Sequence, residues 1–153
     1  MHAIEKRLAE LGVTLPDAPA PAANYVPFVL TGNLVHISGQ ISQNEHGLIK
    51  GRLGEDLSFE QGADAAKRCA ISLLAQLKKS VGGDWDRLSR AVKLTGFVNS
   101  TPDFIDQPTV INGASDFLVA VLGDHGRHAR SAVSAASLPL GVAVEIEAIF
   151  ELK

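Results

Sequence analysis

The segment from Ser58 to Gly83 constrains the fold more than any other part of this sequence. Ser58 and Gln61 form a capping-box pattern that starts a helix, and the pair Gly82-Gly83 is typical of a helix end. Between these signals the apolar residues recur every three or four positions: Phe59, Ala63, Ala66, Ala70, Leu73, Leu74 and Leu77. A helix with one apolar stripe must bury that stripe against another layer, which favours a layered fold.

Two further helices are predicted on the same grounds. One begins near Pro108, because proline is favoured in the first turn of a helix, and ends near Gly123. Its apolar stripe is Ile111, Ala114, Phe117, Leu118, Val121 and Leu122. A short amphipathic helix is predicted within residues 2–11. The connector that follows it contains Pro16, Pro19 and Pro21.

Strand patterns occupy most of the remaining chain. They are predicted at residues 28–30, 34–38, 88–98, 130–136 and 142–150. The first two are joined by a hairpin turn at 31–33, and residues 43–56 are predicted to be a loop. The last strand alternates, with Glu145 and Glu147 on the face opposite its apolar side chains. The order helix, β, β, α, β, α, β, β predicts an α+β fold with helices on one face of a mixed sheet.

Composition limits the classes of protein to consider. The 153 residues, 46% of them hydrophobic, fit a single domain over residues 1–153. We expect no secretory leader, because charged residues interrupt the N-terminal segment early, and no apolar run approaches the roughly 20 residues that span a bilayer. We therefore expect a cytoplasmic protein without a membrane partner. The formal net charge of −3 disfavours nucleic acid as a partner.

Residues 130–149 carry the most specific motif. They read Arg-Ser-Ala-Val-Ser-Ala-Ala-Ser-Leu-Pro-Leu-Gly-Val-Ala-Val-Glu-Ile-Glu-Ala-Ile. This block resembles the signature of the RidA/YjgF family, also called endoribonuclease L-PSP-like. The run Leu-Val-His-Ile-Ser-Gly-Gln-Ile at 34–41 is similar to that family's first long strand. The resemblance covers residues 22–152, so residues 1–13 form a helical extension that short members lack.

The resemblance implies a chorismate-mutase-like fold: a mixed, mostly antiparallel sheet with two helices on one face. It also implies a homotrimer in which three sheets form a central barrel and clefts between subunits bind small carboxylates. The activity it implies is the hydrolysis of reactive 2-imino acids and enamines to 2-keto acids and ammonia. No cofactor and no metal are implied.

Individual roles also follow from the resemblance. Arg130 matches the arginine that grips the substrate carboxylate, and Glu145 matches the glutamate that positions water. The matching pocket positions are Tyr25, Gly39, Asn112 and Ala132. Ala132 stands where deaminase members usually have cysteine, and its main-chain groups could still contact a ligand.

These residue types suit the chemistry. A guanidinium matches a carboxylate with two parallel hydrogen bonds and fixes its plane, and a carboxylate can align and deprotonate water. If the strands at 130–136 and 142–150 form a hairpin, Arg130 pairs near residue 149, which leaves roughly 13 Å to Glu145 along the strand. We therefore expect the site to combine Arg130 of one chain with Glu145 of its neighbour.

Two other functions remain open at this point. The same arginine would serve a protein that binds or senses small carboxylates without turnover. A ribonuclease is weaker, because single-strand recognition uses a basic surface with stacking aromatics, and the chain has one Trp and one Tyr. The pair His125 and His128 is a weak metal signal. Cys69 is predicted to be a buried small hydrophobe.

Overall fold

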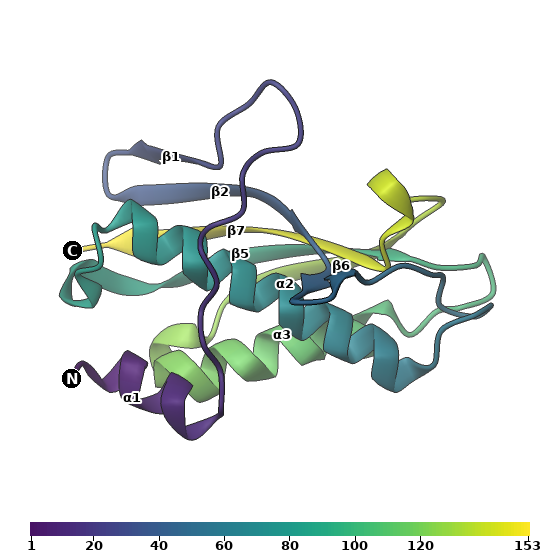
Figure 1. The fold of residues 1–153 in the computed structure, drawn as a ribbon, viewed down its shortest axis with the longest axis horizontal. Coiled ribbons are helices and arrows are strands. Elements are labelled where there is room, and N and C mark those ends of the chain that lie inside the picture. Colours follow the sequence, from purple (N-terminus) through teal and green to yellow (C-terminus); the bar gives the residue numbers. More distant parts are fainter.

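The computed structural model describes residues 1–153 and has one main sheet with the strand order β1-β2-β7-β5-β6 (Figure 1). Its strands are β1 (Phe28–Thr31), β2 (Leu34–Ile41), β5 (Leu88–Asn99), β6 (Ala129–Ala135) and β7 (Val144–Leu152). Only β5 and β6 run parallel to each other, and the other three pairings are antiparallel. The predicted α+β fold with a mixed, mostly antiparallel sheet is confirmed.

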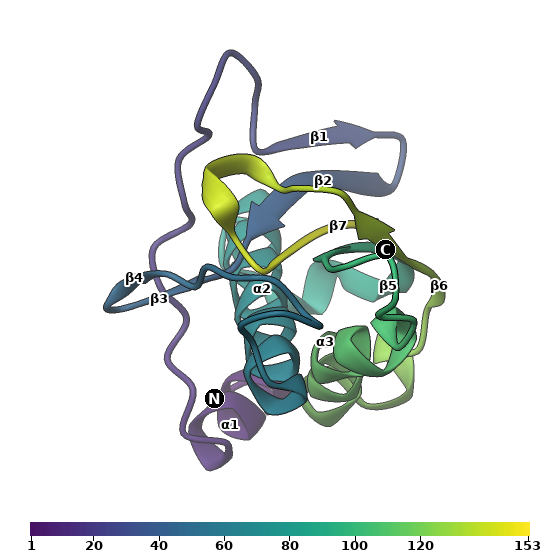
Figure 2. The same ribbon diagram turned by 90° about the vertical axis from the view of Figure 1, so that its right-hand side faces the viewer.

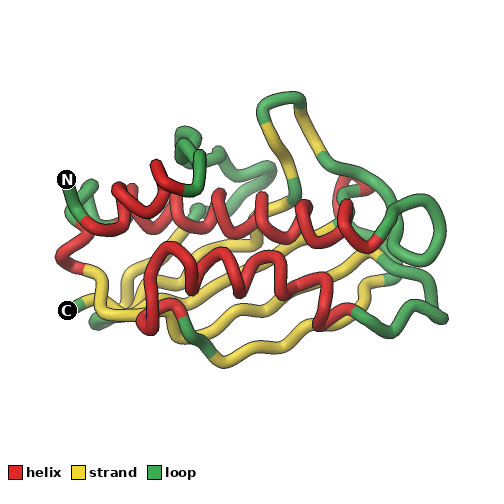
Figure 3. The backbone as a smooth tube through the Cα atoms, turned by 90° about the horizontal axis from the view of Figure 1, so that it is seen from below, coloured by secondary structure: helices red, strands yellow, loops and turns green.

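Three helices accompany the sheet: α1 (Ala3–Glu10), α2 (Phe59–Ser80) and α3 (Gln107–Leu122). The capping box of Ser58 and Gln61 starts α2 as predicted, and Gly123 ends α3 with a positive φ of 66°. Helices α2 and α3 lie side by side across one face of the sheet (Figure 3). The opposite face of the sheet carries no α-helix.

The core lies between these two helices and the sheet. Its largest fully buried side chains include Leu73, Leu74, Leu77, Ile111, Leu118, Leu94, Ile146 and Phe150. They come from the stripes of α2 and α3 and from the central strands β5 and β7. Burying each side chain of this size contributes about 1.5–3 kcal/mol relative to exposure. The helices are therefore fixed to one face of the sheet by the apolar periodicity of their sequences.

The predicted hairpin between the last two strands is wrong. Strands β6 and β7 are not neighbours, because β5 lies between them and pairs with both. The physical reason is the β5-α3-β6 succession: a strand, a helix and a strand form a crossover unit that places the two strands parallel. The chain then passes to the other side of β5, through the short helix η3 (Pro139–Gly141), before it enters β7.

The predicted loop at 43–56 contains a small hairpin. Strands β3 (Gln43–Asn44) and β4 (Gly47–Leu48) pair antiparallel as a separate two-stranded sheet. The rest of the segment is irregular, as expected from its glycines and charges. No helix of the chain combines the length and the apolar character that crossing a membrane requires.

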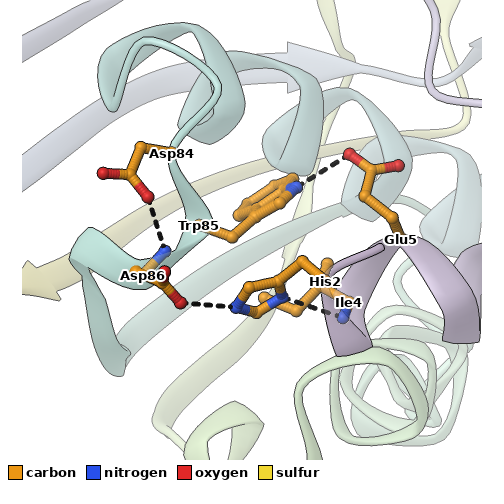
Figure 4. Close-up of polar contacts among 6 residues, drawn as sticks. All are labelled: His2, Ile4, Glu5, Asp84, Trp85 and Asp86. Carbon is orange, nitrogen blue, oxygen red and sulfur yellow. Dashed lines mark hydrogen bonds and ion pairs between the residues drawn. The ribbon is translucent and has the colours of Figure 1, made fainter.

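The N-terminal helix α1 is docked against the rest of the chain. In α1, Ile4 and Leu8 are buried. Glu5 accepts a hydrogen bond from Trp85 Nε1 at 2.8 Å, and His2 Nε2 lies 3.1 Å from Asp86 Oδ1 (Figure 4). The connector from residue 11 to residue 27, here called the strap, then runs past α2 and the β3–β4 hairpin to reach β1 (Figure 2).

Candidate functional site

The face of the sheet without helices carries Glu145 and Glu147, both from β7. Glu145 lies opposite Phe97 of β5, whereas the buried residues Val144 and Ile146 point to the helices. The predicted alternation of this strand is therefore confirmed. Glu145 is half-buried and Glu147 is exposed, so the two carboxylates lie in different surroundings although only one residue separates them.

Glu145 lines a cavity of about 770 Å³, which we call the Glu145 pocket. Its walls are residues 19–23 of the strap, residues 39–41 of β2, and the turn that contains Pro139 and Leu140. Tyr25 and Gly39 also line it. Three of the six predicted site residues, from three separate parts of the sequence, thus meet in one cavity.

Gly39 is required by the position of Glu145. A Cβ atom added at Gly39 would collide with the Glu145 carboxylate, because this side chain lies directly over the glycine. The β2–β7 register shifts between Ile37 and Gln40, so Gly39 lies in a β-bulge. The missing side chain and the bulge together make room for the carboxylate at the sheet surface.

The surroundings of Glu145 change its acidity. Burial raises the pKa of this carboxyl above its ordinary value, and the nearby charge of Glu147 raises it further. Both effects act against the charged form. A carboxylate with a raised pKa is a stronger base, and so is better able to take a proton from water near neutral pH.

Arg130 lies in a different place. It extends from the edge strand β6 toward α3, where its Nη1 donates to Asn112 Oδ1 at 2.7 Å and to Ser115 Oγ at 3.2 Å. We call these three residues the Arg130 cluster. Both hydrogen bonds come from the same nitrogen, so Nη2 and Nε remain for a ligand. The guanidinium borders a shallow depression of about 240 Å³ together with His128.

Arg130 and Glu145 project from opposite faces of the sheet. Arg130 pairs with Leu94 of β5, which is fully buried under the helices. Glu145 pairs with Phe97, which lies three residues further along β5. An odd number of residues along a strand reverses the face. The two positions are also about 10 Å apart along the strands and about 10 Å apart across them. One small molecule cannot contact both side chains within a single chain.

The two remaining predicted residues, Asn112 and Ala132, lie near Arg130 rather than in the Glu145 pocket. Asn112 belongs to the Arg130 cluster and is exposed on α3. Ala132 is half-buried in β6 beside Gly96, and its methyl group packs against the core. Neither residue lines the Glu145 pocket. The predicted set is therefore divided between two groups.

Other titratable residues do not form a metal centre. No group of three or more His, Cys, Asp or Glu side chains is close enough to hold a metal ion. Burial lowers the pKa of His128. Cys69 is completely buried, its Sγ lies 3.5 Å from the carbonyl oxygen of Val144, and burial raises the pKa of its thiol. The prediction that Cys69 is a buried small hydrophobe is confirmed.

The structure adds three residues that the sequence did not single out. Ser115 holds Arg130 and lies one turn of α3 from Asn112, a spacing that marks neighbours on a helix surface. Gln40 lines the Glu145 pocket directly after Gly39. Leu140 lines the same pocket, is 61% exposed and has a positive φ of 60°, which is rare for a residue other than glycine.

A second cavity, of about 460 Å³, lies on the other side of the strap. Side chains from the strap, from the β3–β4 hairpin and from α2 line it, and most of them are polar. It contains none of the six predicted residues. Pro19 and Gln43 line both cavities, so the strap separates them.

Comparisons with known proteins agree with this architecture. A family model described as "YjgF/chorismate mutase-like, putative endoribonuclease" matches residues 5–152. Protein TCP17 of Trypanosoma cruzi is 46% identical over 151 residues, which cover 97% of this chain and 94% of that protein. The crystal structure of Atu1372, a protein of unknown function from Agrobacterium tumefaciens, has 47% sequence identity and a TM-score of 0.92, covering 99% of this chain and 93% of that one.

A more distant relative has a stated activity. A 2-iminobutanoate/2-iminopropanoate deaminase of Dermatophagoides farinae is 27% identical over 139 residues. The match covers 90% of this chain and 92% of that enzyme.

Proposed function

This chain belongs to the YjgF/RidA family, and we propose that it hydrolyses reactive 2-imino acids and their enamine forms to 2-keto acids and ammonia. The observation that carries the proposal is the Glu145 carboxylate, which lies over Gly39 in a cavity and has a raised pKa. The distant relative named as an imine deaminase supports the same chemistry.

The proposed reaction consumes only water. Glu145 takes a proton from a water molecule while the water oxygen forms a bond to the C=N carbon and the π electron pair moves to nitrogen; Glu145 then gives this proton to that nitrogen. In the second step Glu145 takes the remaining hydroxyl proton as the C=O bond forms and the C–N bond breaks, with its electron pair leaving on nitrogen. Glu145 gives this second proton to the departing nitrogen, which leaves as ammonia, so one carboxyl serves as base and then as acid in each step. The atoms balance without an oxidant or a reductant.

The proposed role of Arg130 is to bind the substrate carboxylate. Its free Nη2 and Nε nitrogens present the planar fork that matches a carboxylate. Fixing this group also fixes the plane of the imine, so that its carbon faces the water held by Glu145. Asn112 and Ser115 keep the guanidinium in one orientation.

We further propose that each site lies between two subunits of a homotrimer, with Arg130 from one chain and Glu145 from the next. The separation of the two side chains on opposite faces of the sheet supports this arrangement. The open face also exposes apolar side chains: Val29 is 50% exposed, and Val133, which lies beside Phe97, is 45% exposed. Packing of one subunit against this face would remove these side chains from water.

A direct test uses imino acids produced in situ by an amino-acid oxidase, with keto-acid release followed against the rate in buffer alone. Wild-type protein should accelerate release, and both Arg130→Ala and Glu145→Gln should remove most of that acceleration. A rate equal to the buffer rate would overturn the proposed activity.

Co-expression of the two variants tests the shared site. If the site lies between subunits, random assembly places an intact Arg130 opposite an intact Glu145 at about one quarter of the interfaces of a cyclic trimer. Activity should therefore return to about one quarter of the wild-type value. If each chain contained a whole site, every site would keep one defect and no activity would return.

The second candidate function is binding of small carboxylates without turnover. The position of Ala132 favours it, because no thiol is available beside Arg130 on the strand. In this case, 2-ketobutyrate would bind to the wild-type protein and fail to bind to Arg130→Ala, and imino acids would not be hydrolysed. Calorimetry with 2-ketobutyrate, carried out beside the turnover assay, separates the two functions.

A further inference from the structure

The strap is a wall of the Glu145 pocket as well as a connector. Residues 19–23 line the pocket along much of its length, and Tyr25 follows directly after them. The strap is attached at both ends, since α1 is docked at its start and β1 is paired in the sheet at its end. These residues have no regular secondary structure of their own, so something else must hold them against the pocket.

Gln76 supplies that attachment. It lies near the C-terminal end of α2 and is completely buried. Its Nε2 donates to the carbonyl oxygen of Pro19 at 2.7 Å, and also lies 3.4 Å from Gln40 Oε1. Gln40 in turn donates to the carbonyl oxygen of Ser38 at 2.9 Å, within the bulge. One amide therefore links the strap to the strand that forms the opposite wall.

The other half of the same amide has no partner. Gln76 Oε1 is buried without a hydrogen bond, and an unsatisfied buried polar atom destabilises a fold. A leucine of similar size would fill this position without that penalty. The presence of glutamine among the leucines and alanines of α2 is thus explained by its bond to the strap rather than by packing.

The walls also indicate what the pocket accepts. Glu145 is the only charged side chain that lines it, and the strap contributes only prolines and alanines between residues 19 and 23. The volume of about 770 Å³ is far larger than the smallest imino acids need. An apolar wall beside the reacting centre favours substrates that bury an apolar side chain against it.

We propose that the strap, held in place by Gln76, is the specificity element of the site, and that it selects 2-imino acids with large apolar side chains over those with a methyl or ethyl group. This inference rests on the proposed function, because it assigns the substrate side chain to the strap. Gln76 acts here as a positioning residue, since it touches the strap and not the substrate.

The test compares imino acids formed in situ from leucine, methionine and phenylalanine with those formed from alanine and 2-aminobutyrate. The wild-type protein should have the higher kcat/KM for the large set. Gln76→Glu keeps the size of the side chain but removes the amide donor. This variant should raise KM for the leucine-derived substrate about 10-fold and change KM for the alanine-derived one by less than about 2-fold, a range that apolar contacts account for.

Ser80→Ala is the matched control. Ser80 is buried one turn further along α2, and its hydroxyl donates only to the carbonyl oxygen of Leu77 in the same helix. Loss of this hydroxyl removes a buried hydrogen bond without touching the strap. The ratio of kcat/KM for the large substrates to that for the small ones should therefore stay at the wild-type value. Ala22→Leu adds a second test that leaves the core intact, because Ala22 is exposed in the chain. It should narrow the pocket and reduce activity on the large substrates first.

Hydrogen exchange gives a readout that does not depend on activity. In Gln76→Glu, amides of residues 17–25 should exchange faster, whereas those of α1 should keep their protection. Equal loss on large and small substrates, or unchanged exchange in the strap, would overturn the inference. Wild-type turnover without a size preference would overturn it as well and leave the proposed function standing. Absence of any turnover would overturn the proposed function itself.

Discussion

The Glu145 pocket and the Arg130 cluster differ in how the chain builds them. The pocket is assembled from three segments distant in sequence, namely the strap, β2 and β7, and it half-buries its carboxylate. The Arg130 cluster needs only β6 and the helix α3 before it, and it borders a depression of about 240 Å³. One group is enclosed by its own chain, whereas the other is held in position and left open.

The comparison shows how each chain could hold its own part of a shared site in the working geometry before the subunits associate. Burial raises the pKa of Glu145, so the proposed base is tuned within a single chain. Two hydrogen bonds that Arg130 donates to side chains of α3 orient it but occupy only one of its nitrogens. The Glu145 pocket, here called the enclosed half, and the Arg130 cluster, the open half, are therefore each preorganised within one chain. Association of the subunits would only have to bring the two halves together.

The largest effect is expected from Arg130→Ala. Removing a charged partner of a bound carboxylate costs 2–5 kcal/mol or more, so kcat/KM should fall about 1000-fold. Arg130→Lys is the control: it retains the charge but not the planar fork, and it should recover only a small part of the activity. The melting temperature should change little, because the side chain is only half-buried. A loss of activity smaller than threefold would mean that the open half takes no part in binding.

Glu145→Gln tests the enclosed half and should reduce kcat about 100-fold, the size of effect expected for a general base. The same variant should be more stable than the wild type at neutral pH. Because the pKa of Glu145 is higher in the folded chain than in the unfolded one, its ionisation destabilises the fold as the pH rises through the folded pKa. Thermal melts at acidic and neutral pH check the sign: the gain should disappear in acid. A variant less stable than the wild type at neutral pH would contradict the burial of the carboxylate.

The two halves also differ in how well the sequence revealed them. The limits of α2 and α3 could be predicted because caps, proline and glycine act within a few residues. The partner of each strand could not, since a strand pattern shows which face is apolar but not which edge it joins. The incorrect hairpin between β6 and β7 came from assuming that consecutive strands pair, although the helix α3 between β5 and β6 already favoured a crossover.

The strap shows the same limit more clearly. Its alanines and prolines have no periodicity, so nothing local indicates that they form a pocket wall. Gln76 is equally hidden, because one more polar residue on an amphipathic helix resembles an ordinary surface position. Only the tertiary contact with Pro19 reveals its role. Gly39 was easier to interpret, since a glycine within a strand pattern suggests a bulge or a close approach, and the structure shows both.

Gly39→Ala should have an intermediate effect confined to the enclosed half. The added methyl group would meet the Glu145 carboxylate, which can move aside because it is the end of a flexible side chain. We expect kcat to fall about 10-fold through the displaced base, with little change in binding of 2-ketobutyrate through Arg130. Steady-state kinetics and calorimetry on the same preparation measure the two quantities. Equal losses in both would indicate that the two halves are not independent.

The smallest effect is expected from Glu147→Gln, which changes only the electrostatics of the enclosed half. The charge of Glu147 is the second cause of the raised pKa of Glu145, after burial. Ionised Glu145 is the proposed base, so activity should fall as the pH drops below its pKa. Removing the Glu147 charge lowers that pKa, and the acid limb of the pH–rate profile should move to lower pH by less than about one unit, because Glu147 is exposed and its field is screened. The rate at the plateau should not change. If the limb moved to higher pH, or stayed in place while the plateau fell, Glu147 would be acting on the site by some means other than its charge.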